Sequence, residues 1–331
     1  MTQRFRVVVT DFIVDDLAPE RAVLGDVADV VALNAMKESD LVGRIEDVDA
    51  MLMWHTFILT EATISRLKHC KLITRCGVGY DNVDHVGARK NGIPVANVPD
   101  YGTEEVADSA IGLMLSLTRG ISFFNTRLLR GMTPWSHAQA APLVRLRGRV
   151  LGIVGLGRIG TAVALRAKSL GMDVMFFDPH TPDGSDKSLG IRRAESLPEL
   201  LKQSFVLTLH TPLTPETRHI IGAKEIAQMP RGSYLVNTSR GDVLDVLAIL
   251  DAIRSGQLAG AGIDVLPVEP PPADHPLLVA WRNPADPCHD RVIMNPHAAF
   301  YSEEGLHDMR TKGAQACRRA ILGERLRNIV N

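Results

Sequence analysis

The segment at residues 149–178 restricts the fold of this chain more than any other. An apolar run at 150–154 leads directly into the glycine turn GLGRIG at 155–160. A helical apolar pattern follows and ends at Gly171, and a second apolar run fills 174–177. Strand, glycine turn, helix and strand in this order predict a parallel βαβ unit.

Three glycines and one acid of this unit predict a dinucleotide site. Gly155 permits a tight turn, Gly157 lets the backbone approach a pyrophosphate, and Gly160 lets the helix pack closely on the strand. The helix N-terminus offers N–H groups and its positive dipole end to the phosphates. Asp178 can bind both ribose hydroxyls and would repel a 2′-phosphate, so we predict NAD rather than NADP. A chance glycine turn is the alternative, and the complete βαβ context argues against it. The predicted cofactor-binding residues of this unit are Gly155, Gly157, Arg158, Ile159, Gly160 and Asp178.

The composition excludes several classes of function. The length of 331 residues predicts about two domains. A net charge of −1 gives no electrostatic case for binding nucleic acid or an anionic membrane. The opening MTQRFRVVVTD lacks the apolar core of a signal peptide, and the four cysteines lack disulfide-scaffold spacing, so we expect a cytoplasmic protein with reduced thiols. Cys288-His289 has no second pair of ligands at a recognisable spacing, so no metal site is expected.

Alternating strand and helix patterns extend along the chain. The first part predicts strands at 5–9, 28–32, 49–54, 72–76 and 94–98. Helices are predicted near 39–45, 61–68 and 83–90, with Thr60 and Asn82 as N-caps of the last two. The second part predicts strands at 205–210, 233–238, 260–265 and 291–294, and helices at 103–119, 121–130, 246–255 and 302–322. Two parallel sheets covered by helices predict two α/β domains, with the cleft between them as the ligand site.

The helix at 103–119 is apolar on much of its circumference. Such a helix is either deeply buried or packed against a partner chain.

Three polar residues lie just beyond the last three predicted strands: Arg240, Glu269 and His297. In open α/β sheets, ligands bind outside the carboxyl ends of the strands, and this edge also holds the glycine turn. Each residue taken alone is more often structural or solvated than functional. Their shared edge favours the functional interpretation, in which all three converge beside the cofactor.

The chemistry of these three side chains fits the interconversion of a 2-oxo acid and a 2-hydroxy acid. His297 can gain or lose a proton near neutral pH. Glu269 can fix the imidazole ring, and Arg240 offers a planar fork of donors for a carboxylate or a carbonyl oxygen. We therefore predict hydride transfer between a nicotinamide and C2 of the substrate, with His297 as the acid or the base.

The order of these motifs is similar to that of a known family. GLGRIG, NTSRGDVLD, DVLPVEP and NPHAAFYSEE resemble the D-isomer-specific 2-hydroxyacid dehydrogenases. The resemblance extends to HTFILT, CGVGYDNVD and NVPDYGTEEVADSA, and so covers nearly the whole chain. MWHT, RCGVGYDNVD, DPHTPDG and HAAFYSEE are most similar to the C-terminal-binding protein branch, whose members are transcriptional corepressors that retain a dehydrogenase fold.

The resemblance implies roles for further residues. It implies that Arg240, Glu269 and His297 form the catalytic triad. The implied substrate-binding residues are Arg75, Val78, Gly79, His55 and Phe300, with backbone N–H groups of the Val78-Gly79 loop receiving the substrate carboxylate. The additional cofactor-binding residues are Thr211, Pro212, Thr238, Ser239 and Asp264, with Asp264 at the carboxamide. Arg75 can instead form a structural ion pair. Trp54 is expected to border the same pocket, and the alternative for it is packing in the core.

The resemblance also implies a domain arrangement and an assembly. A Rossmann NAD-binding domain at 102–298 is inserted into a smaller flavodoxin-like substrate domain at 1–101 and 299–331, and the 103–119 helix region forms a homodimer. An NAD-dependent D-2-hydroxyacid dehydrogenase acting as a 2-oxoacid reductase is the preferred function, because every proton-transfer residue is present. The alternative is an NAD(H)-sensing dimeric binding protein of the corepressor type. The sequence identifies neither the 2-hydroxy acid nor the physiological direction, and a phosphorylated substrate ranks lower because Arg75 is the one obvious extra basic residue.

Overall fold

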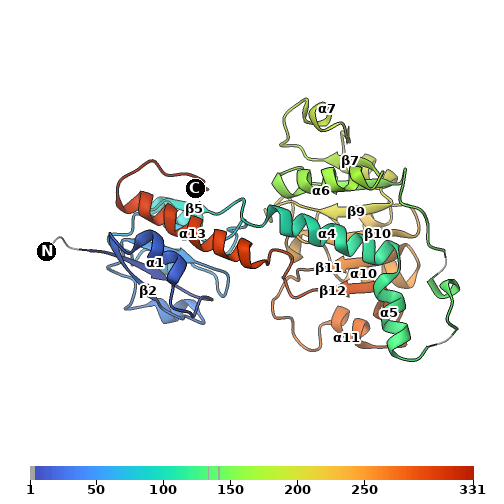
Figure 1. Ribbon diagram of the computed structural model, residues 1–331, viewed down its shortest axis with the longest axis horizontal. Helices are drawn as coiled ribbons and strands as arrows, with labels where there is room; N and C mark the ends of the chain where they lie inside the picture. The colour runs from blue at the N-terminus through green and yellow to red at the C-terminus, as the bar shows by residue number, and fades with distance from the viewer. Residues whose placement is uncertain (1–3, 133, 141) are drawn as a thin grey trace. The chain divides into compact units, whose positions relative to one another are not determined.

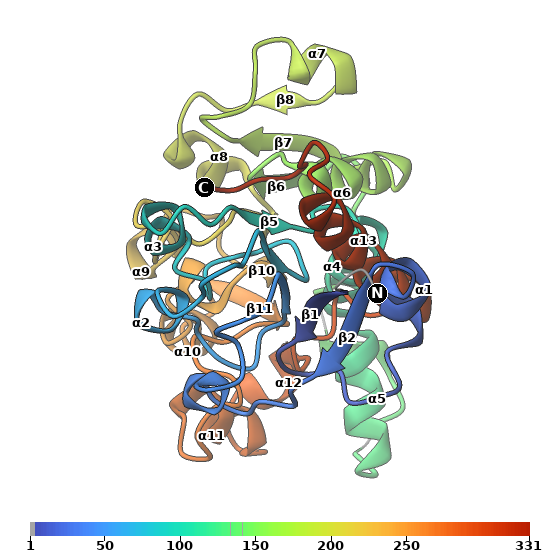
Figure 2. The same cartoon turned by 90° about the vertical axis from the view of Figure 1, so that its left-hand side faces the viewer.

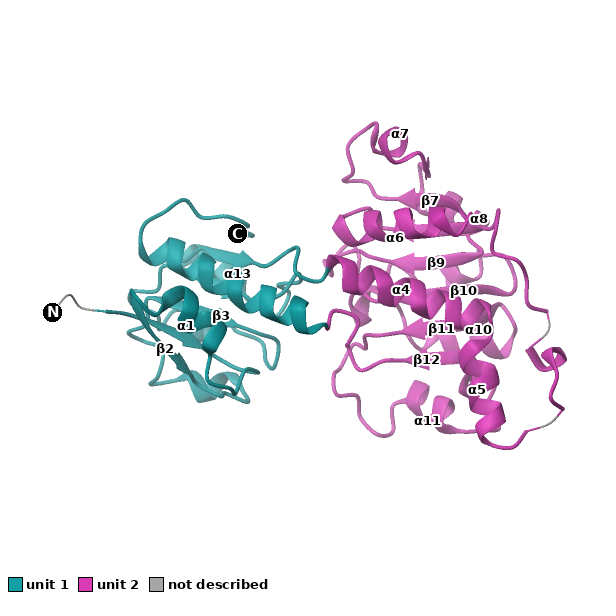
Figure 3. Ribbon diagram, viewed as in Figure 1, with its two compact units in different colours: residues 1–102, 302–331 teal, residues 103–301 magenta. Residues whose placement is uncertain are grey.

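The computed structural model describes residues 4–132, 134–140 and 142–331. The chain divides into two compact units, each built around its own parallel sheet (Figure 3). Unit 1 comprises residues 1–102 and 302–331, and unit 2 comprises residues 103–301. Unit 1 is therefore made from both ends of the sequence, and unit 2 is the continuous segment between them.

Unit 1 contains a five-stranded parallel sheet in the order β2-β1-β3-β4-β5. Its strands are β1 (Phe5–Val9), β2 (Ala28–Ala32), β3 (Ala50–Met53), β4 (Ile73–Arg75) and β5 (Val95–Asn97). Its helices are α1 (Ala18–Leu24), α2 (Glu61–Ile64), α3 (His85–Lys90), α13 (Glu303–Ile321) and the 3-10 helix η1 (Glu38–Leu41). The strand order reverses beside β1, which is the flavodoxin-like form of a doubly wound sheet.

The C-terminal helix α13 belongs to unit 1 and packs on α1, β3 and β4. The Ser302 hydroxyl caps it by accepting the Gly305 N–H at 2.8 Å, as its position before two glutamates predicts. A Cβ on Gly313 would lie 3.1 Å from the Cys76 Sγ, so a glycine there lets the helix approach the sheet closely. The following segment continues along the edge strand, where Ile329 pairs with Ala96.

Two local expectations in unit 1 are wrong in detail, and one helix is additional to those predicted. The predicted 39–45 helix is the single 3-10 turn η1, and α1 had not been predicted. Asn82 does not cap α3, because its amide donates to the carbonyl oxygens of Trp54 and Phe57. Asp84 caps the helix instead, accepting the Gly87 N–H at 2.8 Å. Long-range hydrogen bonds thus took Asn82 away from a role that local sequence assigned to it.

Unit 2 contains a seven-stranded parallel sheet in the order β12-β11-β10-β9-β6-β7-β8 (Figures 1 and 2). Its strands are β6 (Val150–Val154), β7 (Asp173–Phe177), β8 (Arg192–Arg193), β9 (Val206–Leu209), β10 (Ser233–Asn237), β11 (Leu258–Ile263) and β12 (Val292–Met294). Its helices are α4 (Thr103–Thr118), α5 (Ile121–Leu129), α6 (Arg158–Ser169), α7 (Ser185–Leu189), α8 (Leu197–Gln203), α9 (Ala223–Ile226), α10 (Ala248–Arg254), α11 (Pro276–Arg282) and α12 (Cys288–Arg291), with 3-10 helices η2 (His137–Ala140) and η3 (Gly241–Val243). The strand order reverses between β6 and β9, as in Rossmann sheets.

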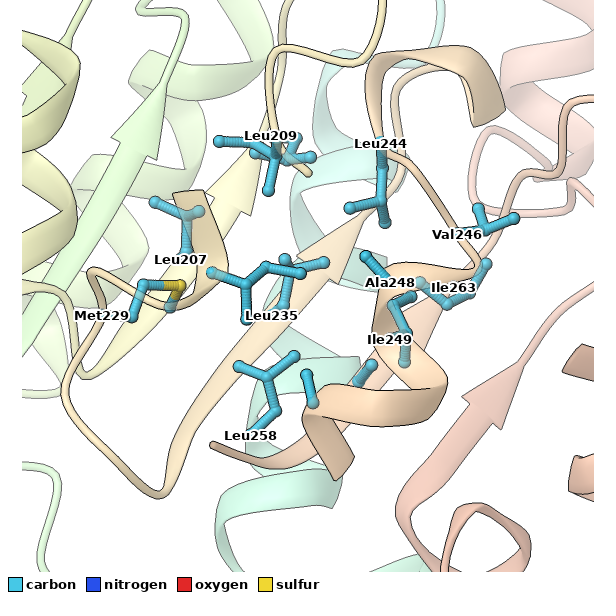
Figure 4. Close-up of a cluster of buried hydrophobic side chains, with 14 of the residues drawn as sticks. Leu207, Leu209, Met229, Leu235, Leu244, Val246, Ala248, Ile249, Leu258 and Ile263 are labelled. Atoms are coloured by element: carbon cyan, nitrogen blue, oxygen red, sulfur yellow. The ribbon is translucent and has the colours of Figure 1, made fainter. Parts of the chain in front are cut away.

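Apolar side chains cover both faces of this sheet. On one face, Leu207, Leu235 and Leu258 pack with Ile249 of α10 in the cluster shown in Figure 4. On the other face lie α4 and α6. Alternate residues along each strand therefore serve two different cores, which explains the nearly continuous apolar runs in the sequence.

Helix α4 is buried within its own unit rather than left bare on the surface. Leu113 of α4 lies over Gly262 of β11, and Leu117 lies over Gly260. A Cβ on either glycine would lie 3.0 Å from the facing leucine side chain. The glycines of β11 thus let the helix lie close to the sheet. The sequence left two explanations for the apolar circumference, burial or packing against a partner chain. Burial accounts for much of it, since seven residues of α4 are buried.

The predicted fold class, two doubly wound parallel sheets in α/β domains, is confirmed. Within the described part of the chain, no helix has the length and apolar character needed to cross a membrane. The same residues contain no cluster of three or more histidine, cysteine or acidic side chains arranged to hold a metal ion. All four cysteines are free and buried.

Candidate active site

The glycine turn after β6 has the geometry that a pyrophosphate site needs. Gly155 has a φ of 92°, and a Cβ there would lie 2.8 Å from the His210 carbonyl oxygen. A Cβ on Gly160 would lie 2.1 Å from the Gly155 carbonyl oxygen, so the first turn of α6 closes tightly on the loop. At Gly157, by contrast, a Cβ would meet nothing within 4 Å. Glycine there leaves open space at a helix N-terminus that has no side-chain cap.

Asp178 lies beyond the end of β7 and faces the same turn. Its Oδ2 accepts the Leu156 N–H at 2.8 Å, and its Oδ1 accepts the His180 N–H at 2.8 Å. A pocket of about 400 Å³ opens beside it, within the range of volumes usual for small-molecule sites. Its lining includes Gly157, Asp178, His180, Thr181, Ser185 and Leu189. His180 and Thr181 were not predicted, although they are polar residues just past a strand end.

Two buried hydroxyl groups mark the ends of β9 and β10 next to the point where the strand order reverses. The Oγ1 atoms of Thr211 and Thr238 are buried and have no hydrogen-bond partner among the described residues. Buried polar atoms normally have partners, so these two fit a polar ligand at this edge. Together with the glycine turn and Asp178, they make the residues present compatible with a dinucleotide.

Ser239 and Pro212, also predicted at the cofactor, lie on the same two strand ends. Ser239 donates through its N–H and its hydroxyl to the Asn237 Oδ1, at 3.0 and 2.8 Å. The Pro212 carbonyl oxygen accepts the Thr217 hydroxyl at 2.6 Å. Asn237, which had not been singled out, therefore shapes the loop that carries Ser239.

His297 and Glu269 form a close pair at this edge of unit 2. The His297 Nδ1 lies 2.6 Å from the Glu269 Oε2, and the other carboxylate oxygen accepts the Leu266 N–H at 2.8 Å. Burial acts to raise the pKa of Glu269, but the hydrogen bond and charge of His297, the Leu266 N–H and the charge of Arg240 hold it below its usual value. The carboxylate is therefore ionised and oriented towards the imidazole.

The backbone of His297 is left-handed, with a φ of 54°, which is uncommon for a residue other than glycine. Asp264 holds this conformation: its carbonyl oxygen accepts the His297 N–H at 2.8 Å, and its carboxylate accepts the N–H groups of Ala298 and Ala299. Burial raises the pKa of the Asp264 carboxyl above its usual value, although the hydrogen bonds from the Ala298 and Ala299 N–H groups act to lower it. Asp264 therefore supports the histidine loop, which the sequence had not indicated.

Arg240 is placed by a close contact between two loops. It precedes η3, and its carbonyl oxygen accepts the Asn237 Nδ2 at 2.9 Å. A Cβ on the next residue, Gly241, would lie 2.0 Å from the Leu266 carbonyl carbon, so the Arg240 loop packs directly on the loop that leads to Glu269. The structure thus brings Arg240, Glu269 and His297 together on the edge that carries the glycine turn.

Phe300 is near this group, with its ring centroid 6.1 Å from that of His297 and the two rings almost perpendicular. The aromatic residue predicted for the substrate pocket therefore belongs to unit 2 and contacts the histidine itself.

The remaining predicted substrate residues lie at the carboxyl edge of the unit 1 sheet. His55 follows β3, and Val78 and Gly79 follow β4. The Asn97 Nδ2 donates to the Val78 carbonyl oxygen at 2.6 Å and fixes this loop. Trp54 is almost fully buried, as its core-packing alternative requires.

Arg75 is buried at the end of β4. Its Nη1 donates to the Cys76 carbonyl oxygen at 2.9 Å, and its Nε donates to the Asn82 Oδ1 at 3.4 Å. A Cβ on Gly77 would lie 1.3 Å from the guanidinium, so the glycine at 77 makes room for this arginine.

The sequence and the fold match known proteins over most of the chain. Residues 111–299 match the family model "D-isomer specific 2-hydroxyacid dehydrogenase, NAD binding domain". The chain is 35% identical over 326 residues to the D-3-phosphoglycerate dehydrogenase of Methanocaldococcus jannaschii, and the aligned region covers 98% of this chain and 59% of that protein. This chain thus spans about three fifths of that relative. It is 37% identical over 295 residues to the glyoxylate reductase of Korarchaeum cryptofilum, covering 88% of this chain and 85% of that protein.

Solved structures give the same result. The D-lactate dehydrogenase of Aquifex aeolicus, complexed with NAD and lactic acid, superposes with a TM-score of 0.83 at 28% identity over 96% of both chains. The glyoxylate reductase of Paecilomyes thermophila superposes with a TM-score of 0.84 at 30% identity, over 99% of this chain and 98% of that one. With the family model matched over more than half of its residues, this chain belongs to the D-isomer specific 2-hydroxyacid dehydrogenases and contains their NAD-binding domain.

Proposed function

We propose that this protein is an NAD-dependent D-2-hydroxyacid dehydrogenase that works as a 2-oxoacid reductase. The observation that carries the proposal is the 2.6 Å contact between His297 and Glu269, on the sheet edge where the glycine turn and Arg240 also lie. An acid–base group fixed by a carboxylate next to a dinucleotide site is what hydride transfer to a carbonyl carbon requires.

Each member of the triad has a distinct task. When bound, the nicotinamide cofactor supplies or accepts the hydride at C2 of the substrate. His297 turns its Nδ1 to Glu269, which leaves Nε2 to give a proton to the carbonyl oxygen or to take one from the hydroxyl. Arg240 binds the substrate carboxylate or the polarised oxygen through its planar guanidinium. Glu269 keeps the ring in one orientation throughout.

The cofactor is held by the strand ends of unit 2. Gly155, Gly157 and Gly160 form the pyrophosphate turn, with the N–H groups of Arg158 and Ile159 at the helix start. Asp178 binds the adenosine ribose beside the 400 Å³ pocket. The remaining contacts come from residues described above: Thr211, Pro212, Thr238, Ser239 and, at the carboxamide, Asp264.

Unit 1 with its returning helix is the substrate domain in this proposal. In unit 1, the backbone of Val78 and Gly79 binds the substrate carboxylate and His55 is a further substrate contact. In unit 2, Phe300 is the substrate contact beside His297. Arg75 contributes charge to the Val78-Gly79 loop while it holds the Cys76 carbonyl oxygen.

The test is NADH oxidation by the purified protein with glyoxylate, hydroxypyruvate, pyruvate, larger apolar 2-oxo acids and a phosphorylated one. His297→Asn should retain NADH affinity and lose most of its turnover, because Asn cannot transfer the proton. His69→Asn, at an exposed position of unit 1, is the matched control and should behave as wild type. Absence of turnover with every acid, in protein that binds NADH, rejects the proposal, and normal turnover of His297→Asn removes His297 from its assigned task.

A binding protein of the corepressor type is not favoured, because the relatives named above are dehydrogenases and reductases. The similarity to the corepressor branch therefore remains a prediction from short motifs.

We also propose a cytoplasmic homodimer formed through the α4 region. Since the larger apolar side chains of α4 at Leu113, Met114 and Leu117 are buried in unit 2, the surface for this contact comes from α5, which follows it directly and has no buried residue. Ile121, Leu128 and Leu129 are exposed there. Light scattering on wild type and on Leu129→Glu tests this, since a charge at the interface should produce monomers.

A further inference from the structure

The loop of unit 1 between β1 and α1 holds an aromatic side chain on an unusual backbone. Phe12 has a φ of 67° and Leu17 has a φ of 59°, both in the left-handed region. Bulky residues rarely adopt this region, and they remain there when the surroundings enforce it. Leu17 is buried and anchors the loop, whereas Phe12 is 45% exposed. Core packing therefore does not explain the position of the Phe12 ring.

Asp11 fixes the backbone directly before this ring. Its carboxylate is buried and accepts the Trp54 N–H at 2.9 Å and the Thr56 N–H at 2.8 Å. Its own carbonyl oxygen accepts the Ile13 N–H at 2.8 Å, which closes a tight turn around Phe12. These bonds tie the end of β1 to the loop that follows β3, so the turn cannot open without breaking contacts between strands.

An ion-pair network around the buried Arg310 fixes the other end of the loop. The Arg310 guanidinium, 7% exposed on α13, forms a two-pronged pair with Glu20 of α1, both distances being 2.7 Å. The same guanidinium binds both carboxylate oxygens of Asp15, at 2.6 and 2.8 Å. Asp15 also accepts the Leu17 N–H at 2.8 Å. The β1–α1 loop is therefore held from both sides, with α13 lying beside α1 (Figure 3).

The held loop presents Phe12 to two aromatic neighbours. Its ring centroid lies 4.6 Å from that of His55 and 5.2 Å from that of Trp54. We call these three residues the aromatic cluster. They follow β1 and β3, which are adjacent parallel strands, so the cluster lies at the carboxyl edge of the sheet. Because Trp54 is buried, the exposed apolar surface of the cluster is supplied mainly by Phe12.

We infer that Phe12 is a specificity-determining residue that selects 2-oxo acids with bulky apolar side chains. The inference rests on the proposed function, in which the Val78-Gly79 loop after β4 binds the substrate carboxylate. In the sheet, β4 is next to β3 and β3 is next to β1. A substrate that is anchored after β4 and extends its side chain along this edge meets His55 first and then Phe12.

Distance decides which acids reach the ring. Adjacent strands are about 4.8 Å apart, so the end of β1 lies about 10 Å from the end of β4. A substrate with an aromatic or branched side chain, together with the length of the Phe12 side chain, spans this gap. Glyoxylate, with a hydrogen in place of a side chain, does not. The Phe12 ring has no hydrogen-bonding group, so it favours apolar groups over a phosphate or a hydroxyl.

The test compares kcat/KM for glyoxylate, pyruvate, 4-methyl-2-oxopentanoate and phenylpyruvate in wild type and in Phe12→Ala. Wild type should use the two bulky acids best. The kcat/KM of Phe12→Ala should fall about tenfold or more with those two acids and less than about twofold with glyoxylate. The reason is that removing the ring affects only substrates whose side chains contact it. Val14→Ala, in the same loop and 78% exposed, is the matched control and should leave the ratio unchanged.

Phe12→Asn removes the ring but suits a left-handed backbone, so it replaces the alanine variant if that one fails to fold. An equal loss with all four acids, or no loss, overturns the inference while leaving the reductase activity in place. Absence of turnover with every acid in wild type instead rejects the proposed function, and the assignment of Phe12 with it.

Discussion

Glu269→Gln tests the proposed mechanism at its most closely defined contact. The carboxylate accepts two donors, the His297 ring nitrogen at 2.6 Å and the Leu266 N–H at 2.8 Å. Glutamine has one acceptor oxygen, so its NH₂ group must face one of these donors. If the oxygen stays on Leu266, the NH₂ group requires an unprotonated Nδ1, and the imidazole can no longer carry both protons. The variant thus nearly preserves shape and removes the charge that orients the ring.

The size of the effect follows from the geometry. A hydrogen bond to a charged group contributes about 1.5–3 kcal/mol, which corresponds to a loss in kcat of about 10- to 150-fold. The two side chains are 31% and 35% exposed, so solvent screening places the expected loss in the lower part of this range. The loss should fall on kcat rather than on KM, because Glu269 acts on the histidine and does not bind the substrate.

The assay is the initial rate of NADH oxidation at saturating 2-oxo acid, from acid to alkaline pH, with Glu195→Gln as an exposed control. A rate for Glu269→Gln within about twofold of wild type at every pH refutes the reasoning, as does a change confined to KM.

Stability provides an independent measurement on the same variant. The pKa of Glu269 is lowered in the folded protein, so its ionised form adds stability that is present above its usual pKa and lost as the pH falls through the folded-state value. The difference in unfolding free energy between wild type and Glu269→Gln should therefore narrow in acid. A constant difference contradicts the assigned role of the charge.

Two further substitutions test the cofactor turn and the network that holds the β1–α1 loop. Gly160→Ala places a Cβ 2.1 Å from the Gly155 carbonyl oxygen and should weaken NADH binding about tenfold or more, or about 1.4 kcal/mol, in a fluorescence titration. Gly112→Ala, on α4 where a Cβ meets nothing within 4 Å, is its control, and equal affinities would contradict the turn assignment. Arg310→Met leaves the Glu20 carboxylate buried and unpaired and should cost about 3–5 kcal/mol in denaturant unfolding, whereas Arg310→Met combined with Glu20→Met should recover most of it. If the single variant loses less than about 1 kcal/mol of unfolding free energy, the Glu20 carboxylate is stabilised by water or by relaxation of the structure, which contradicts the assigned role of Arg310.

Much of unit 2 was predictable because its signals are local. The glycine turn, the helix after it and the acid at 178 stand in one continuous segment, and short-range sterics decide where glycine is required. Arg240, Glu269 and His297 were predictable as a group because the ends of neighbouring parallel strands meet at one edge. Asn82 shows the limit of local rules, since a distant pair of carbonyl oxygens decided its role.

The features that escaped prediction depend on contacts between distant residues. Phe12 looks like an ordinary apolar residue at the end of a strand, and a left-handed backbone leaves no pattern in the sequence. Its position follows from the hydrogen bond of Asp11 to the Trp54 N–H, just after β3, and from the ion pair of Asp15 with Arg310, nearly three hundred residues away. Asp264, predicted at the carboxamide of the cofactor, also binds the histidine loop through its carboxylate, and no local sequence pattern indicates those bonds.

By itself, the sequence determined the fold class and the preference for NAD and indicated His297 as the candidate acid–base group, because these depend on glycine sterics, apolar periodicity and the chemistry of single side chains. The tertiary structure decided what each side chain touches: the 2.6 Å pair at His297, the buried hydroxyls at the strand ends and the exposed ring of Phe12. Hydrogen bonds and packing between residues far apart in the chain set those contacts, and only folding brings such residues together.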